Sequence, residues 1–196
     1  MPDFSIESQH SGIIAGIDEA GRGPLAGPVV ASAVILNKEN LPVGINDSKK
    51  TSIKKRNLLY QQIKDSSIFA VGIATVEEID DINILNATML AMKRAIDNLS
   101  VKPDLCLIDG NKTPENLNCK SLAIIKGDSL SLNIAAASII AKVTRDKIML
   151  NLSEEHPQYL WSKNSGYGTK QHLQAITDFG ITKHHRKSFK PVSAMI

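Results

Sequence analysis

Two apolar runs near the N-terminus constrain the fold most, because only a short turn separates them. Residues 13–18 (IIAGID) and 28–36 (PVVASAVIL) are rich in β-branched side chains, which is typical of buried strands. The turn between them is rich in glycine and proline. The pattern predicts a hairpin-like pair of strands at the start of the chain.

Strand-like and helix-like segments alternate after this pair. Strands are predicted over residues 68–75, 104–109 and 121–126, and helices over 83–99 and 131–150. A further helix is expected to start at the NDS segment of residues 46–48. The first half of the 131–150 segment is made of small residues, which let a helix lie close to a sheet. Together these segments predict an α/β fold with a mixed sheet.

The chain changes character after Pro157, where a short helix and a basic tail follow. Thr169 is the expected cap of that helix and Gly180 its stop. The length of 196 residues suits one substantial domain. We therefore expect a core over residues 1–155 and a helical, basic C-terminal appendage over residues 156–196 of the same domain.

Composition excludes several classes of protein. No apolar stretch approaches the ~18–20 residues of a membrane span, and the N-terminus lacks the pattern of a signal peptide. A cytoplasmic protein is expected. The two cysteines, Cys106 and Cys119, are too few for a disulfide framework or a zinc-binding cysteine cluster, so free buried thiols are expected.

Basic residues gather in two segments although the net charge is only +3. Residues 46–57 hold five bases and one acid, and residues 181–196 hold Lys183, Arg186, Lys187 and Lys190 and no acid. Either segment alone is typical of a solvated face. Two such segments in one chain favour a polyanionic partner.

Four acids share one kind of position, the end of a predicted strand. Asp18 and Glu19 end the first strand, Asp109 ends the fourth, and Asp128 follows the fifth. Carboxylates brought together raise one another's pKa unless cations neutralise them, and oxygen ligands suit Mg²⁺ or Mn²⁺. Each acid taken singly is also typical of a solvated turn or a helix cap. The spacing therefore permits a metal site without establishing one.

The turn GRGPLAG at residues 21–27 resembles a dinucleotide-binding glycine motif only weakly. The glycine spacing differs, and a strand follows the turn where a helix would be needed. A nucleotide-cofactor enzyme is therefore a minor alternative, which cofactor protection against thermal unfolding would reveal. Backbone amides in such a turn are still able to approach a sugar or phosphate closely.

A series of longer motifs occurs in order along the chain: GIDEAGRGPLAGPVVASAVIL at 16–36, NDSKK at 46–50, IDGN at 108–111, KGD at 126–128, IAAASIIAKVTRD at 134–146, SGYGTKQH at 165–172 and HRKSF at 185–189. Together these motifs resemble the signature of bacterial ribonuclease HII, the type 2 ribonuclease H. The resemblance implies a ribonuclease H-like fold, with a five-stranded mixed sheet flanked by helices. It also implies a metal-dependent endoribonuclease that cleaves RNA in RNA–DNA hybrids and nicks DNA duplexes 5′ of single ribonucleotides, leaving 3′-hydroxyl and 5′-phosphate ends.

The resemblance assigns roles to particular residues. The family's metal-binding acids fall on Asp18, Glu19, Asp109 and Asp128, which would bind two Mn²⁺ or Mg²⁺ ions. The turn residues Gly21, Arg22 and Gly23 would sense the ribose 2′-hydroxyl, which distinguishes RNA from DNA, and Tyr167 would pack on the neighbouring sugar. Lys49, and with less support Lys142 and Arg145, would contact phosphates.

Other nearby groups are expected to play structural parts. Asp146 is expected to pair with a nearby base or to cap a structural element rather than bind metal. The histidines 172, 184 and 185 are able to ligate a metal, but their basic surroundings favour surface or nucleic-acid-facing positions.

Two features depart from or refine the resemblance. Thr51 stands where the family usually has a hydrophobic residue, and the aspartate at position 128 argues against the related ribonuclease HIII. A monomer is expected. A non-catalytic nucleic-acid-binding module on the same fold is the remaining alternative; it would bind hybrids without metal and never cut them.

Overall fold

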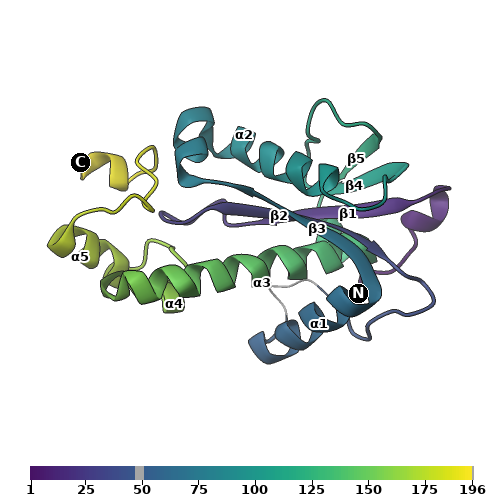
Figure 1. The fold of residues 1–196 in the computed structure, drawn as a ribbon, viewed down its shortest axis with the longest axis horizontal. Coiled ribbons are helices and arrows are strands. Elements are labelled where there is room, and N and C mark those ends of the chain that lie inside the picture. Colours follow the sequence, from purple (N-terminus) through teal and green to yellow (C-terminus); the bar gives the residue numbers. More distant parts are fainter. Residues whose placement is uncertain (47–50, 196) are drawn as a thin grey trace.

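A computed structural model describes residues 1–46 and 51–195 and contains one five-stranded sheet (Figure 1). The strand order is β3-β2-β1-β4-β5. The strands are β1 (Ile14–Ala20), β2 (Val29–Leu36), β3 (Ser67–Ala74), β4 (Leu105–Asp109) and β5 (Lys120–Ile124). β1, β2 and β3 pair antiparallel, whereas β4 runs parallel to β1 and β5 parallel to β4. The predicted mixed sheet and its N-terminal hairpin are confirmed.

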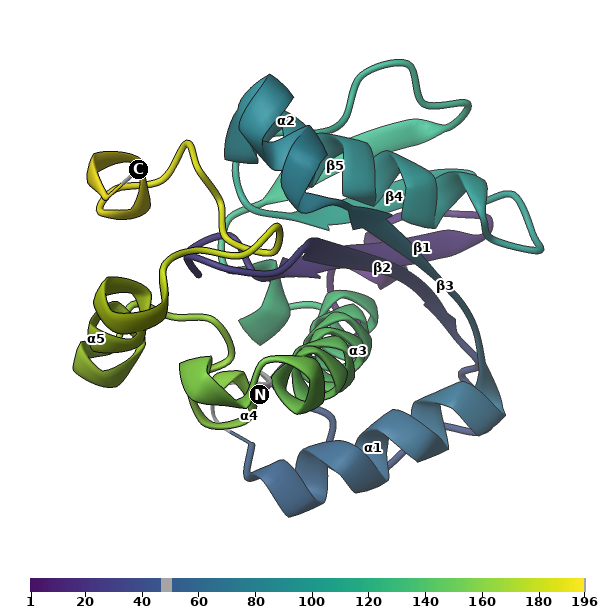
Figure 2. The ribbon, with the colours of Figure 1, turned by 60° about the vertical axis from the view of Figure 1, so that its left-hand side comes forward.

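Helices cover both faces of this sheet (Figures 1 and 2). Helix α2 packs on one face, and α3 packs on the other with α1 outside it. The α-helices are α1 (Ile53–Ser66), α2 (Val76–Asp97), α3 (Leu132–Glu155), α4 (Trp161–Asn164) and α5 (Lys170–Phe179). Short 3-10 helices are η1 (Glu7–Gln9), η2 (Gly127–Ser129), η3 (Pro157–Tyr159) and η4 (Val192–Ala194).

Small residues let α3 approach the sheet, as the sequence predicts. A Cβ added at Gly16 in β1 would lie 2.1 Å from the backbone carbon of Asn133 in α3. Gly72 in β3 plays the same part on the opposite face, where a Cβ would lie 2.1 Å from the Ala91 carbonyl oxygen of α2. The two glycines therefore set the spacing of all three layers.

Helix α2 is longer than the sequence prediction of 83–99. It begins at Val76, where Thr75 and Glu78 form a capping box, and it is interrupted at Asn83, whose φ of 66° is not helical. The Asn83 side chain accepts hydrogen bonds from the N–H groups of Leu85 and Asn86 and so restarts the helix. The prediction found this second start and missed the Thr-x-x-Glu signal of the first.

Other helix boundaries agree to within a few residues. Helix α1 begins after the N-cap Ser52, later than the predicted NDS start, of which residues 47 and 48 lie outside the described ranges. Helix α3 extends to Glu155 instead of residue 150. Thr169 caps α5, and Gly180 ends it, as predicted.

The C-terminal segment packs on the glycine turn and the end of α3. Tyr159, Trp161 and Val192 form one apolar cluster with Leu25 of the turn and Met149 of α3. Residues 156–195 are thus built around the same turn that joins β1 to β2. The boundary between residues 155 and 156 stays a prediction.

Two further expectations concern cysteines and membranes. Cys106 is buried and Cys119 half-buried; both are free, and their sulfur atoms lie 3.3 Å apart.

Within residues 1–46 and 51–195, none of the helices has the length and apolarity that a membrane crossing requires.

Candidate active site

Two of the four acids meet because their strands are neighbours. Ile17 pairs with Ile108 in the parallel β1–β4 register, so Asp18 and Asp109 follow at the same level of the sheet. Alternation along each strand turns both side chains toward the face covered by α3. Asp18 is nearly fully buried there, and Asp109 is half-buried.

The other two acids lie on adjoining segments. Glu19 follows Asp18 in β1, and the buried Asp128 lies in η2, directly after β5. The Gly127 N–H donates to Asp109 Oδ1 over 2.7 Å, which ties η2 to the end of β4. The sequence-predicted acids are therefore brought to one edge of the sheet.

Burial and charge act together on Asp18. Its pKa is raised well above the ordinary value, first because the carboxyl is buried and then because Glu19 and Asp109 carry like charges. Hydrogen bonds from Ser138 of α3 and from the Glu19 N–H oppose the shift. A divalent cation would neutralise this cluster, so the residues present fit a hard metal ion with oxygen ligands.

Among the residues that the structure describes, one ligand atom from each of Glu155, His156 and His184 lies within 4.8 Å of the others, and this group includes none of the four acids.

Two buried arginines hold the glycine turn in place. Arg186 donates to the carbonyl oxygens of Gly21, Arg22 and Gly27 over 2.5–3.0 Å. Arg145 donates from the other side, to the carbonyls of Pro28, Ala26 and Ser165 over 2.9–3.0 Å. Gly21 has φ +100°, and a Cβ there would meet the Arg145 side chain. The turn is thus shaped from both sides by internal guanidinium groups.

The burial of these two arginines differs from what the sequence predicts. Arg145 was expected to contact phosphates, but it is only 1% exposed and its guanidinium is bound to three carbonyls. Arg186 was counted among the basic tail residues, yet it is fully buried. Burial lowers the pKa of Arg145 to about 10 and that of Arg186 to about 9, so both stay charged at neutral pH.

A cleft of about 220 Å³ opens between this turn and α3. It is lined by Glu19, Ala20, Gly21, Arg22, Gly23, Ser138, Lys142, Arg145 and Tyr167. Tyr167 is 49% exposed, and its ring lies 3.5 Å from the position a Cβ would take on Gly23. Arg22 forms an ion pair with Glu19 over 3.3 Å. The cleft therefore joins a predicted metal-binding acid to the predicted recognition residues.

Two basic side chains lie beside Asp146. Lys142 lines the cleft and donates to Asp146 over 2.7 Å, and Arg56 lies 3.9 Å from the same aspartate. The prediction that Asp146 pairs with a base is confirmed. Lys49 lies within residues 47–50, outside the described residues.

The expectation of surface histidines is wrong for His172 and His185, which are fully buried. His172 Nδ1 lies 2.9 Å from the Tyr167 carbonyl oxygen, so this nitrogen carries the proton and donates. Its Nε2 then accepts from Trp161 Nε1–H over 3.0 Å and from His185 Nε2–H over 3.1 Å. His185 Nδ1 accepts the Thr182 N–H over 2.9 Å. Two neutral imidazoles thus connect the backbone of Tyr167 to the segment that carries Arg186.

Comparison with known proteins identifies this arrangement. The family model for ribonuclease HII matches residues 15–192. The chain belongs to the ribonuclease HII family. It is 57% identical over 192 residues to the ribonuclease HII of Wolbachia pipientis subsp. Culex pipiens (strain wPip), covering 97% of both chains. It is 61% identical over 181 residues to that of Rickettsia akari (strain Hartford), covering 92% of this chain and 93% of the relative.

The structural comparison agrees with the family. The crystal structure of the ribonuclease H2 from Pyrococcus horikoshii OT3 superposes with a TM-score of 0.77 at 25% identity, covering 93% of this chain and 96% of that one. The predicted ribonuclease H-like fold is confirmed. The chain is a type 2 ribonuclease H, an endoribonuclease that hydrolyses RNA in RNA–DNA hybrids, and its family depends on divalent metal ions. Family membership favours this enzyme over the binding module and the nucleotide-cofactor enzyme.

Proposed function

We propose that Asp18, Glu19, Asp109 and Asp128 form the catalytic site and bind Mg²⁺ or Mn²⁺. The observation that carries this proposal is the burial of Asp18 between Glu19 and Asp109, which raises its pKa. Such a cluster opposes folding unless a cation compensates it. When bound by these acids, divalent ions would supply an activated water and a charge that stabilises the leaving oxygen of a phosphodiester.

The residues around the acids orient them. Ser138 and the Glu19 N–H fix the Asp18 carboxylate, and the Gly127 N–H fixes that of Asp109. Hydrogen-bonded carboxylates keep their lone pairs aimed in one direction, which is what a metal ligand needs. The strand and helix scaffold thus places the acids before any ion binds.

We infer that the cleft beside Glu19 recognises the junction between a ribonucleotide and DNA. Gly21, Arg22 and Gly23 present a backbone without Cβ atoms at the glycines, so a ribose 2′-hydroxyl is able to approach closely. Tyr167 offers a half-exposed ring opposite Gly23 on which a sugar can pack. Lys49 would contact a phosphate. The product would be a nick 5′ of the ribonucleotide, with 3′-hydroxyl and 5′-phosphate ends.

An end-labelled DNA duplex with one embedded ribonucleotide tests the proposal. Purified protein is incubated with this duplex and with an all-DNA control in Mg²⁺, in Mn²⁺ and in EDTA. A metal-dependent nick 5′ of the ribonucleotide, absent from the control duplex, is expected. Asp18→Asn should abolish it, whereas Asp65→Asn, which changes an exposed acid of α1, should not. Full cleavage by Asp18→Asn would overturn the assignment.

A further inference from the structure

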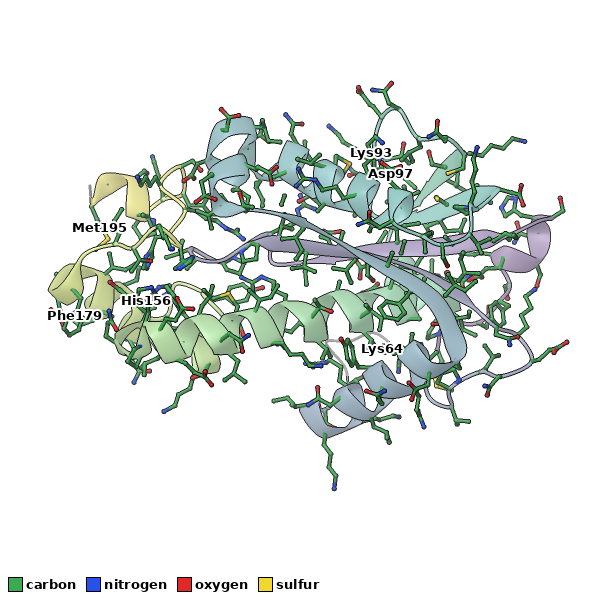
Figure 3. All side chains as sticks on the ribbon, viewed as in Figure 1. Lys64, Lys93, Asp97, His156, Phe179 and Met195 are labelled. Atoms are coloured by element: carbon green, nitrogen blue, oxygen red, sulfur yellow. The ribbon has the colours of Figure 1, made fainter. Side chains whose placement is uncertain are left out.

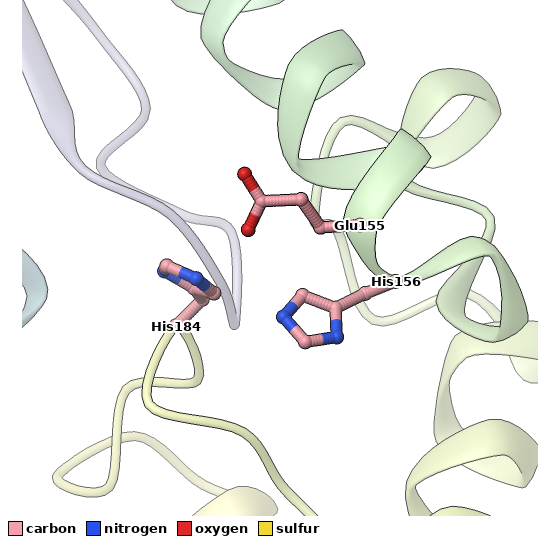
Figure 4. Close-up of side chains that lie close together, drawn as sticks. All are labelled: Glu155, His156 and His184. Atoms are coloured by element: carbon pink, nitrogen blue, oxygen red, sulfur yellow. The ribbon is translucent and has the colours of Figure 1, made fainter.

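A second group of potential metal ligands lies at the far end of α3. Glu155 is the last residue of α3, His156 is its C-cap, and His184 lies in the segment between α5 and η4. One ligand atom from each lies within 4.8 Å of the others. Figure 4 shows the Glu155 carboxylate and the His156 ring facing His184. In Figure 3, His156 lies at the end of the molecule that also holds Phe179 and Met195.

We propose that Glu155, His156 and His184 bind a divalent transition-metal ion of the Zn²⁺ class. Two imidazoles and one carboxylate are a frequent ligand set for such ions, with the remaining coordination positions filled by water. Imidazole is a poor ligand for Mg²⁺, so this site differs in chemistry from the four catalytic acids. The proposed transition-metal site does not depend on the catalytic role proposed for those acids.

The burial of one ring nitrogen of the half-buried His184 supports this proposal. Its Nε2 atom is buried, and within the described part of the chain no hydrogen-bond partner reaches it. A buried imidazole nitrogen without a partner costs free energy, and a metal ion would remove that cost. The sequence predicts a surface or nucleic-acid-facing position for this histidine; the residue is half-buried, and its buried Nε2 atom points to a ligand.

Packing holds the other histidine in place. The His156 ring lies edge-on against Trp161 at 5.6 Å between centroids and against His184 at 5.4 Å. A ligand fixed in advance loses little conformational entropy when it binds an ion. Glu155 is exposed, so it is free to turn toward the two rings.

Nearby charges act in both directions. Glu77, in the first turn of α2, lies close enough to His184 to favour a cation, whereas Lys183 opposes one. The carboxylates of Glu155 and Glu77 reduce the electrostatic cost of placing a cation beside His184, and the Lys183 ammonium group increases it.

An ion at this position would connect α3 to the glycine turn of residues 21–27. The His184 carbonyl accepts the Gly27 N–H over 2.9 Å, and His185 forms an isolated β-bridge with Ala26. The ion would therefore fix the segment that carries Arg186 against the end of α3. Its expected effect is structural: added stability of the C-terminal segment rather than a chemical step.

Calorimetric titration of tag-free, EDTA-stripped protein with Zn²⁺ tests the site, with Mg²⁺ in large excess to occupy the catalytic acids. Wild type should bind one Zn²⁺, and thermal unfolding should shift upward in Zn²⁺. His184→Gln and Glu155→Gln should each weaken binding by more than about tenfold and remove the thermal shift. Glu155 is exposed, so its variant should fold normally even if His184→Gln does not.

The matched controls are Glu154→Gln, the exposed neighbour in the same helix, and His10→Gln, an exposed histidine near the N-terminus. Both should bind Zn²⁺ as wild type does. The proposal fails if wild type binds no Zn²⁺ under these conditions. It also fails if Glu155→Gln and His184→Gln bind as tightly as the controls.

Discussion

The guanidinium of Arg186 donates to the carbonyl oxygen of Gly21, 165 positions earlier in the chain. The same side chain also binds the carbonyls of Arg22 and Gly27. One buried cation near the C-terminus thus shapes the turn that lines the cleft. The planar fork of arginine matches this set of acceptors, and the single ammonium of lysine does not.

Arg186→Lys should therefore damage both stability and substrate recognition. Loss of several hydrogen bonds to buried carbonyls is expected to lower the free energy of unfolding by about 2–4 kcal/mol. Urea denaturation measures that loss, and cleavage of the single-ribonucleotide duplex measures the effect on the turn. Lys187→Ala, which changes the exposed neighbour, should leave both readings near wild type. Unchanged stability in Arg186→Lys would contradict the clamp.

Asp18→Asn is expected to stabilise the metal-free protein while it removes activity. The pKa of Asp18 is raised in the folded state, so a charged Asp18 at neutral pH opposes folding. Removing that charge should raise the free energy of unfolding in EDTA by about 1–3 kcal/mol. Thermal unfolding in EDTA and in Mg²⁺ provides the measurement.

Metal addition should reverse the order of thermal stability of wild type and Asp18→Asn. Mg²⁺ or Mn²⁺ should raise the unfolding temperature of wild type and have a smaller effect on Asp18→Asn, because the ion binds the folded wild-type cluster. In EDTA, without metal, the variant would be the more stable of the two proteins. It would be inactive in every buffer. An Asp18→Asn protein less stable than wild type in EDTA would show that the buried charge is already compensated.

The strands and the four acids were predictable, whereas the internal clamps were not. Apolar β-branched runs predict the β1–β2 pair, and the predicted strand ends indicate the same four acids as the family resemblance. Arg145 and Arg186 carry no local sign of burial, because their partners are carbonyls that a distant turn leaves unpaired. The capping box at Thr75 is marked in the sequence by the glutamate three residues later, Glu78.

The C-terminal histidines show the same limit. His172 and His185 stand in a basic stretch, which is typical of a surface. Their burial depends on Trp161 and on the Tyr167 carbonyl, and these partners meet them only after α4 and α5 fold. The local charge is typical of a surface, but tertiary packing buries both histidines.

The neutral pair of His172 and His185 predicts a loss of stability in mild acid. Burial and the charge of neighbouring histidines lower the pKa of His185 from 6.5 to about 4, and burial also lowers the pKa of His172. The unfolded chain then binds more protons than the folded one between those values. The free energy of unfolding should therefore fall as the pH drops from 6.5 toward 4, and should not depend on this pair above 6.5.

Comparison with His185→Asn isolates this effect from carboxylate titration. The asparagine oxygen is able to accept the Thr182 N–H but does not titrate. Between pH 7 and pH 5, wild type should lose about 1–2 kcal/mol more than the variant, as measured by urea denaturation at each pH. Parallel pH profiles would show that the imidazole pair is not held neutral by the fold.

Replacement by alanine should have different effects on stability at Gly16 and at Gly23. A Cβ on Gly16 would lie 2.1 Å from the α3 backbone, so Gly16→Ala must push the helix off the sheet. Its free energy of unfolding should fall by about 3 kcal/mol or more. A Cβ on Gly23 would meet nothing nearer than the Tyr167 ring at 3.5 Å, so Gly23→Ala should change stability by less than about 0.5 kcal/mol.

The Gly23→Ala methyl group would instead occupy the cleft opposite Tyr167, where the proposal places the ribose. Cleavage of the single-ribonucleotide duplex should fall about tenfold or more, since crowding of a close contact costs at least about 1.4 kcal/mol of binding to the transition state. The loss should appear without any change in the urea midpoint. A Gly23→Ala protein that cleaves at the wild-type rate would place ribose recognition elsewhere on the turn, whereas one that unfolds easily would make Gly23 a structural residue like Gly16.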